Sequence, residues 1–98
     1  MTITSCTGGS GHRNTIQGTT TANTGTLTLR IYAGAGTTGT LAATLPTSSF
    51  TGSASPFGWS VSTANNQLAA GATYTAQATH VDAAGATGNP VTCTFTAN

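Results

Sequence analysis

Apolar residues recur at every second position along several stretches of this chain, and this spacing constrains its fold more than any other feature. In the stretch 25–34, GTLTLRIYAG, the apolar Leu27, Leu29 and Ile31 alternate with polar residues. Successive side chains of an extended strand point to opposite faces, so the pattern predicts a strand with one buried face. Gly, Thr and Ser interrupt every candidate helical period. We therefore expect an all-β protein.

Six further segments have the same character and are separated by turn signals rich in Gly, Pro, Asn and Ser. Three are clear strand candidates: FGWSVS (57–62), TYTAQATHV (73–81) and PVTCTFT (90–96). Three are weaker: TITSC (2–6), NTIQGTT (14–20) and TLAATLP (40–46). About seven strands, each with one polar face, predict a single domain over residues 1–98 in which two antiparallel sheets share a core.

Charge is almost absent from the sequence. Only 3% of the residues are charged, namely Arg13, Arg30 and Asp82, and the formal net charge is +1. Nucleic-acid partners are excluded because they call for a clustered basic patch. Membrane insertion is excluded because there is neither a long apolar run nor a basic amphipathic segment. The start, MTITSCTGG, has no signal-peptide features. Either the chain is not exported through a signal, or it is an excised piece of a longer protein.

The two cysteines, Cys6 and Cys93, lie near opposite ends of the chain. Two interpretations are open: a structural disulfide that joins the first and last strands, or two buried thiols. We expect the disulfide. Closing so long a loop would stabilise the fold by about 4–5 kcal/mol on the chain-entropy model, and it would imply an oxidising environment.

The order of features from Thr24 to Asn98 resembles the bacterial Ig-like domains, which occur as repeats of bacterial surface proteins and in phage virion proteins. GTLTLRIYAG looks like the strand that ends in a Gly-rich hairpin, and FGWSVS looks like the Gly-x-Trp-Ser strand. LAAGATYTAQAT (68–79) is similar to the Leu-x-x-Gly…Tyr-Thr segment, and HVDAAGATGN (80–89) resembles the Asp-x-Ala-Gly-Asn turn. The connection TLPTSSFTGSASPFG is longer than in a typical repeat, and the cysteines do not bracket the tryptophan as an Ig-type pair does.

The resemblance implies an Ig-like Greek-key β-sandwich and gives three residues structural roles. Trp59 would be the core aromatic. Tyr74 would form a tyrosine corner, with its ring buried and its hydroxyl bonded to the backbone a few residues upstream. Asp82 would stand in the turn before the last strand.

His80 and Asp82 stand two residues apart, which raises the question of catalysis or metal binding. A catalytic triad also needs a nucleophile, and no glycine-framed nucleophile elbow is present. We expect Asp82 to accept backbone N–H groups in the turn up to Gly85 instead, with His80 at the mouth of the sandwich. Calcium prefers several carboxylates, and this chain has only Asp82. A metal site formed by His12 and His80 would need the two side chains brought together. Glycosidase activity is excluded because it needs paired carboxylates. We therefore expect no enzyme activity, no catalytic residue, no cofactor and no metal.

The remaining feature is a set of threonine rows on the predicted outer faces: Thr26/Thr28, Thr73/Thr75/Thr79 and Thr92/Thr94/Thr96. A flat row could order water, as in ice-binding proteins, but sandwich sheets twist. Carbohydrate binding would need more exposed aromatics than Tyr32. An uncharged hydroxyl surface suits close packing against protein partners. We therefore expect a non-enzymatic structural or attachment module at a virion surface, such as a phage head-decoration or tail protein. The alternative is an excised repeat of a secreted bacterial cell-surface adhesin.

Overall fold

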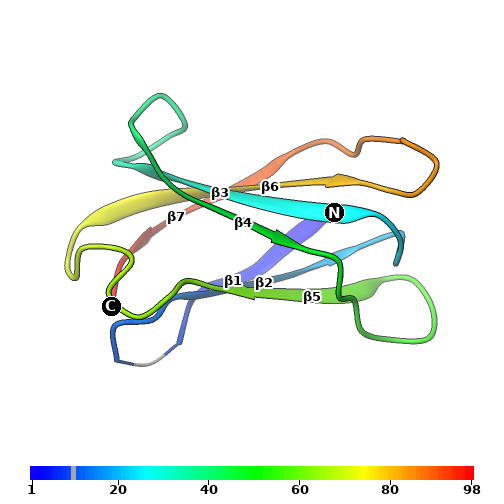
Figure 1. Cartoon of the computed structure of the whole chain (residues 1–98), viewed down its shortest axis with the longest axis horizontal. Helices are drawn as coiled ribbons and strands as arrows, with labels where there is room; N and C mark the ends of the chain where they lie inside the picture. Colours follow the sequence, from blue (N-terminus) through cyan, green and yellow to red (C-terminus); the bar gives the residue numbers. More distant parts are fainter. Residues whose placement is uncertain (10) are drawn as a thin grey trace.

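The computed structural model describes residues 1–9 and 11–98, and this part of the chain forms seven antiparallel strands in two packed sheets (Figure 1). The strands are β1 (Thr2–Gly8), β2 (Thr15–Thr20), β3 (Thr26–Ala33), β4 (Leu41–Thr47), β5 (Phe57–Ser62), β6 (Thr73–Val81) and β7 (Val91–Thr96). One sheet has the order β1-β2-β5, and the other has the order β4-β3-β6-β7. The prediction of an all-β sandwich of about seven strands is confirmed.

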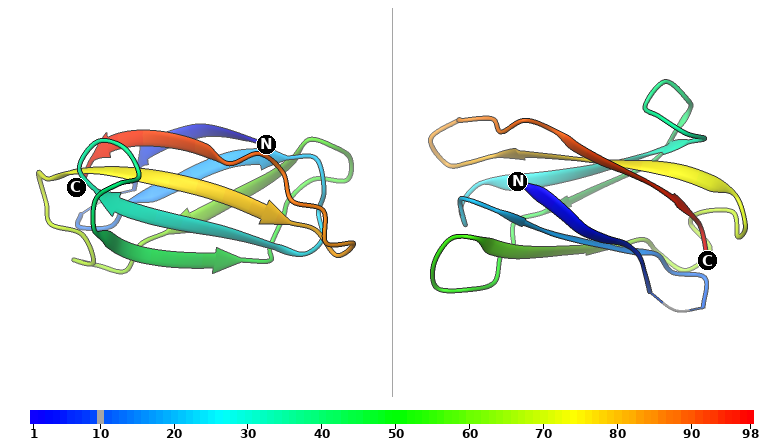
Figure 2. Two further views of the ribbon diagram at one scale, coloured as in Figure 1. Left: turned by 90° about the horizontal axis from the view of Figure 1, so that it is seen from above. Right: turned by 180° about the vertical axis from the view of Figure 1, so that it is seen from behind.

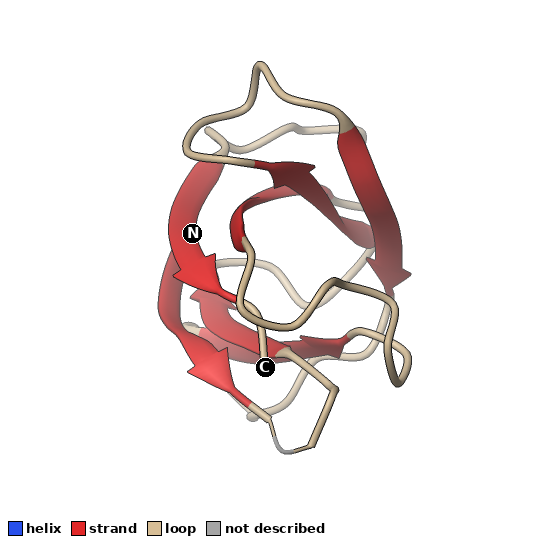
Figure 3. Ribbon diagram, turned by 90° about the vertical axis from the view of Figure 1, so that its left-hand side faces the viewer, coloured by secondary structure: helices blue, strands red, loops and turns tan. Residues whose placement is uncertain are grey.

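The chain passes repeatedly from one sheet to the other. It crosses between β2 and β3, between β4 and β5, and between β5 and β6. As a result β2 pairs with β5, and β3 pairs with β6, in the Greek-key manner. Figure 3 looks along the molecule and shows the strands arranged around the core. This topology is compatible with an Ig-like domain.

The core follows the predicted alternation. Leu27, Leu29 and Ile31 of β3 are fully buried, and the inward residues of β6 pack beside them. Thr75 departs from the pattern, because it lies on the polar face of β6 and is nevertheless buried. The hairpin after β3 bends over it: the Gly36 N–H donates to Thr75 Oγ1 at 2.8 Å, and the Thr75 hydroxyl donates to the Gly34 carbonyl at 2.9 Å.

Trp59 of β5 lies against the backbone of β2 at Gly18. A Cβ atom added at Gly18 would stand 2.6 Å from Trp59 Cζ2 and would also overlap the Thr2 carbonyl oxygen. Glycine is therefore required at this position by the close approach of an aromatic ring and a neighbouring strand. The indole is 3% exposed and belongs to the main core cluster.

The two termini lie towards opposite ends of the long axis, as the views of Figures 1 and 2 agree. The molecule measures 37 × 27 × 18 Å along its principal axes. The two termini therefore lie in different halves of an elongated sandwich.

Candidate functional site

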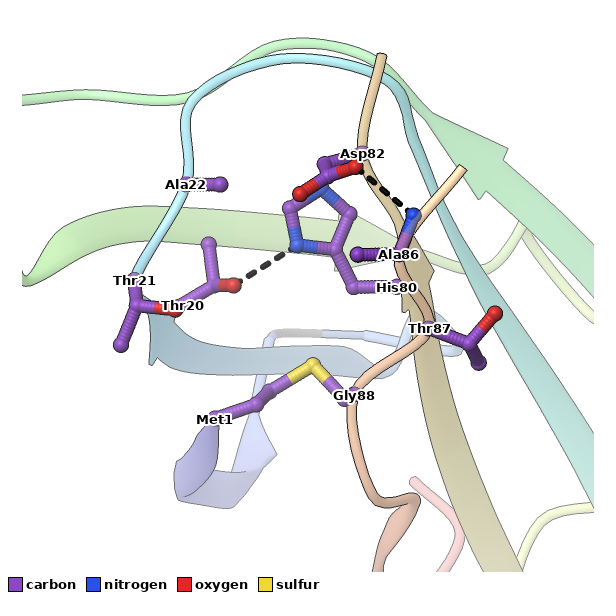
Figure 4. A pocket seen from close by; sticks show the side chains of 9 residues that line it. All are labelled: Met1, Thr20, Thr21, Ala22, His80, Asp82, Ala86, Thr87 and Gly88. Carbon is purple, nitrogen blue, oxygen red and sulfur yellow. Dashed lines mark hydrogen bonds between the residues drawn. The ribbon is translucent and has the colours of Figure 1, made fainter. Parts of the chain in front are cut away.

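A cavity of about 180 Å³ opens at the end of the sandwich where β6 stops (Figure 4). Its walls come from the N-terminus, the segment after β2, the end of β6 and the turn that follows. The lining residues are Met1, Thr20, Thr21, Ala22, His80, Asp82, Ala86, Thr87 and Gly88. The structure thus places His80 and Asp82 in the lining of one cavity.

His80 is 5% exposed, and both of its ring nitrogens have partners. Nε2 lies 2.7 Å from the Thr24 carbonyl oxygen, and Nδ1 lies 2.7 Å from Thr20 Oγ1. A carbonyl oxygen can only accept, so Nε2 carries a proton, and the Thr20 hydroxyl, which can donate or accept, is the partner of Nδ1. The Phe50 ring covers His80 with its centroid 5.0 Å away.

The hydrogen bond from Thr20 to His80 joins the two sheets, because Thr20 belongs to β2 and His80 to β6. The Thr20 side chain is itself 3% exposed. The ring therefore ties together the open end of the sandwich and also holds the loop that contains Thr24. Sequence reasoning missed Thr20 and Thr24, since neither a threonine at the end of a strand nor one in the following loop indicates a partner more than fifty residues away.

Asp82 organises the turn after β6. Its Oδ1 accepts the backbone N–H of Ala84 at 3.0 Å and that of Ala86 at 2.9 Å. The backbone of the turn closes with a bond from the Gly85 N–H to the Asp82 carbonyl. The carboxylate therefore accepts two backbone N–H groups of its own turn, as Asp commonly does.

Cys6 and Cys93 lie side by side on the two terminal strands. Both are free thiols and partly buried. Cys6 Sγ lies 4.0 Å from the carbonyl oxygen of Thr94, the residue next to Cys93 in β7. Burial, together with the hydrogen bond and the charge of Cys6, raises the pKa of Cys93 from 9.0 to about 12. The disulfide between them stays a prediction.

Tyr74 and Trp59 both lie in the core. The Tyr74 hydroxyl accepts the backbone N–H of Ala69 at 2.9 Å, five residues upstream, which is the arrangement of a tyrosine corner. The ring of Tyr74 also packs against Phe95 of β7, with centroids 6.1 Å apart. Trp59 Nε1 is buried and makes no hydrogen bond within the described residues.

The far end of the sandwich holds the C-terminus in a network that the sequence did not reveal. The Asn98 N–H donates to the buried Asn14 side chain at 2.9 Å, and the Asn98 amide donates to the Arg13 carbonyl at 2.9 Å. The Asn14 N–H in turn donates to Thr63 Oγ1 at 3.0 Å. His12 lies in this hairpin between β1 and β2, at the opposite end from His80, so the two histidines are not brought together.

The outer faces of the two sheets differ in charge. The outer face of the three-stranded sheet carries only uncharged polar side chains, which we call the hydroxyl face: Thr2, Thr4, Thr15, Gln17, Thr19, Ser60 and Ser62. The outer face of the four-stranded sheet carries Arg30, which is partly exposed and stands opposite Thr44 on one side and Gln77 on the other.

Within the described part of the chain, no three His, Cys, Asp or Glu side chains are grouped so as to hold a metal ion. Nor does any helix among these residues have the length and apolarity to cross a membrane. None of the family models, curated proteins or solved structures that were compared with the chain matches it. Inferences about function therefore rest on the geometry.

Proposed function

We propose that this protein is a non-enzymatic structural and attachment module that packs against protein neighbours at a virion surface, as a phage head-decoration or tail protein would. The observation that carries the proposal is the hydroxyl face, a surface across three strands with no charged side chain. The resemblance of the sequence to bacterial Ig-like domains supports the virion setting, because such domains occur in phage virion proteins.

The hydroxyl face is suited to burial because part of its hydrogen bonding is already satisfied within the sheet. Thr2 Oγ1 and Thr19 Oγ1 lie 2.6 Å apart, and Thr15 Oγ1 and Ser62 Oγ lie 2.8 Å apart. Burying a polar group without a partner is costly. Hydroxyls that already bond each other lose less when a neighbour displaces water from them.

The face also loses little conformational freedom when it is covered. Six of its seven side chains are threonine or serine, and only Gln17 is long. Long flexible side chains cost about 0.5–1.5 kcal/mol each when an interface immobilises them. A contact through this face avoids that cost at all positions but one, and it buries no charge of its own.

Two matched variants test this proposal by sedimentation velocity over a series of concentrations. Gln17→Lys places a cation at the centre of the hydroxyl face, where Gln17 stands opposite Ser60. Gln77→Lys makes the same change on the outer face of the other sheet, opposite Arg30. We expect the unmodified protein to associate as its concentration rises, Gln17→Lys to weaken that association, and Gln77→Lys to preserve it. A protein that is monomeric throughout, or equal effects of the two variants, would contradict the proposal.

A second candidate function is that of one repeat in a bacterial cell-surface adhesin. The observation that favours it is the position of the termini towards opposite ends of the long axis, which allows copies to be joined end to end (Figure 2). A fusion of two copies in one chain, measured by small-angle X-ray scattering, tests it. An extended, rod-like fusion is expected for a repeat, and two domains that tumble without a defined arrangement would count against it.

A further inference from the structure

The seam between β1 and β7 is where the two sheets approach each other without sharing a backbone ladder. β1 is the edge strand of one sheet and β7 is the edge strand of the other. Both lie along the same side of the sandwich in the two views of Figure 2. The inner side chains of the two strands, including both cysteines, pack against the common core.

β1 is the strand whose pairing is least regular. It has one hydrogen-bonded neighbour, β2, and its register with β2 shifts twice, between Ile3 and Ser5 and between Ser5 and Gly8. By contrast, β2 pairs with β5 without a shift over six consecutive positions. Irregular edge pairing of this kind provides few backbone hydrogen bonds to hold the strand.

We propose that Cys6 and Cys93 form a redox clasp, in which a small-molecule disulfide oxidises the two adjacent thiols to a disulfide that fastens β1 to β7. The clasp stands apart from the proposed function, because it concerns how the fold is secured rather than what it contacts. Three observations support this. The Cys6 sulfur lies 4.0 Å from the carbonyl oxygen of Thr94, the residue next to Cys93. The two cysteines belong to the edge strands of different sheets, and both are partly exposed to reagents.

The chemistry is two successive thiol–disulfide exchanges with an oxidant such as oxidised glutathione. The thiolate of one cysteine attacks a glutathione sulfur, which forms a mixed disulfide and releases one glutathione thiolate. The thiolate of the other cysteine then attacks the protein sulfur of that mixed disulfide and releases the second glutathione. The protein loses two electrons and two protons, and one glutathione disulfide becomes two molecules of glutathione.

The buried position of Cys93 limits the rate at which the disulfide forms. In either order of attack each cysteine acts once as the nucleophile, so every route passes through the Cys93 thiolate. Burial raises the pKa of Cys93, which leaves little thiolate near neutral pH. Closure of the clasp is therefore expected to be slow at pH 7 and to accelerate as the pH rises.

The test is to treat the reduced protein with oxidised glutathione, and to follow its intact mass and the amide hydrogen exchange of its strands. We expect the mass to fall by two hydrogens without a retained glutathione, and a dithiol to reverse the change. Cys6→Ser and Cys93→Ser should each retain at most a single glutathione on the remaining thiol. Oxidation should slow amide hydrogen exchange in β1 more than in β4. β4 is the edge strand of the four-stranded sheet that lies farthest from β7.

Two results would overturn the proposal. One is a protein that keeps both thiols, or stops at a glutathione adduct, after prolonged treatment at alkaline pH under conditions in which circular dichroism shows it to be folded. The other is a disulfide whose formation leaves exchange in β1 unchanged. Neither result bears on the association of the hydroxyl face, so the two proposals fail independently.

Discussion

Replacing Thr20 with valine removes the hydroxyl that joins the two sheets through His80 and keeps nearly the same side-chain shape. Thr20 is 3% exposed and His80 is 5% exposed, so the change leaves Nδ1 buried without its hydrogen-bond partner. Such a group costs about 1–3 kcal/mol. In a domain of this size that corresponds to a decrease of roughly 5–20 °C in the melting temperature. The lower part of the range applies if water from the adjacent cavity reaches the ring.

Urea denaturation followed by tryptophan fluorescence measures this loss, since Trp59 is the only tryptophan. Thr20→Ser retains a hydroxyl and should recover most of the stability. Thr96→Val makes the same chemical change at an exposed position of β7 and should alter the free energy of unfolding by less than about 0.5 kcal/mol. If Thr20→Val proves as stable as Thr96→Val, then the bond to His80 does not secure the open end of the sandwich.

Three further perturbations follow from the same geometry. Gly18→Ala should destabilise the fold by about 3 kcal/mol or more, because its methyl group would overlap the Trp59 ring; a normal denaturation midpoint would refute the close approach. Tyr74→Phe should cost about 1–2 kcal/mol by leaving the Ala69 N–H without its acceptor, and an unchanged melting temperature would show that the corner bond carries no weight. In the reduced protein the pKa of Cys93 is higher in the folded state than in the unfolded chain, so the folded state keeps this thiol protonated at a pH where the unfolded chain has lost the proton. The stability that results is fully present below pH 9 and is lost as the pH rises towards about 12. Thermal melts over this range should show a steeper decline than those of Cys93→Ser, and parallel curves would argue against it.

The strands could be predicted from the sequence because their signal is local. The spacing of Leu27, Leu29 and Ile31 alone predicts a buried face, and all three side chains are fully buried. The failures of this pattern have non-local causes. Thr75 is buried because a glycine-rich hairpin from another strand bends over it. Leu41, near the start of the weaker predicted strand 40–46, is 48% exposed, beside the register shift between β3 and β4.

The candidate site was predictable only in part, for the same reason. The turn at Asp82 needs groups two and four residues away, so the sequence contains all of it. The partners of His80 are more than fifty residues distant in the chain and depend on which strands face each other. The position of Cys6 beside the residue next to Cys93 also depends on the topology, which sets the two terminal strands side by side.

The molar mass of the reduced protein in solution, measured by light scattering over a wide series of concentrations, tests the central claim most directly. A module that packs through its hydroxyl face should show a mass that rises from that of the 9.6 kDa chain towards a defined oligomer or a growing assembly. A mass that stays at the monomer value at every concentration would contradict self-packing through that face.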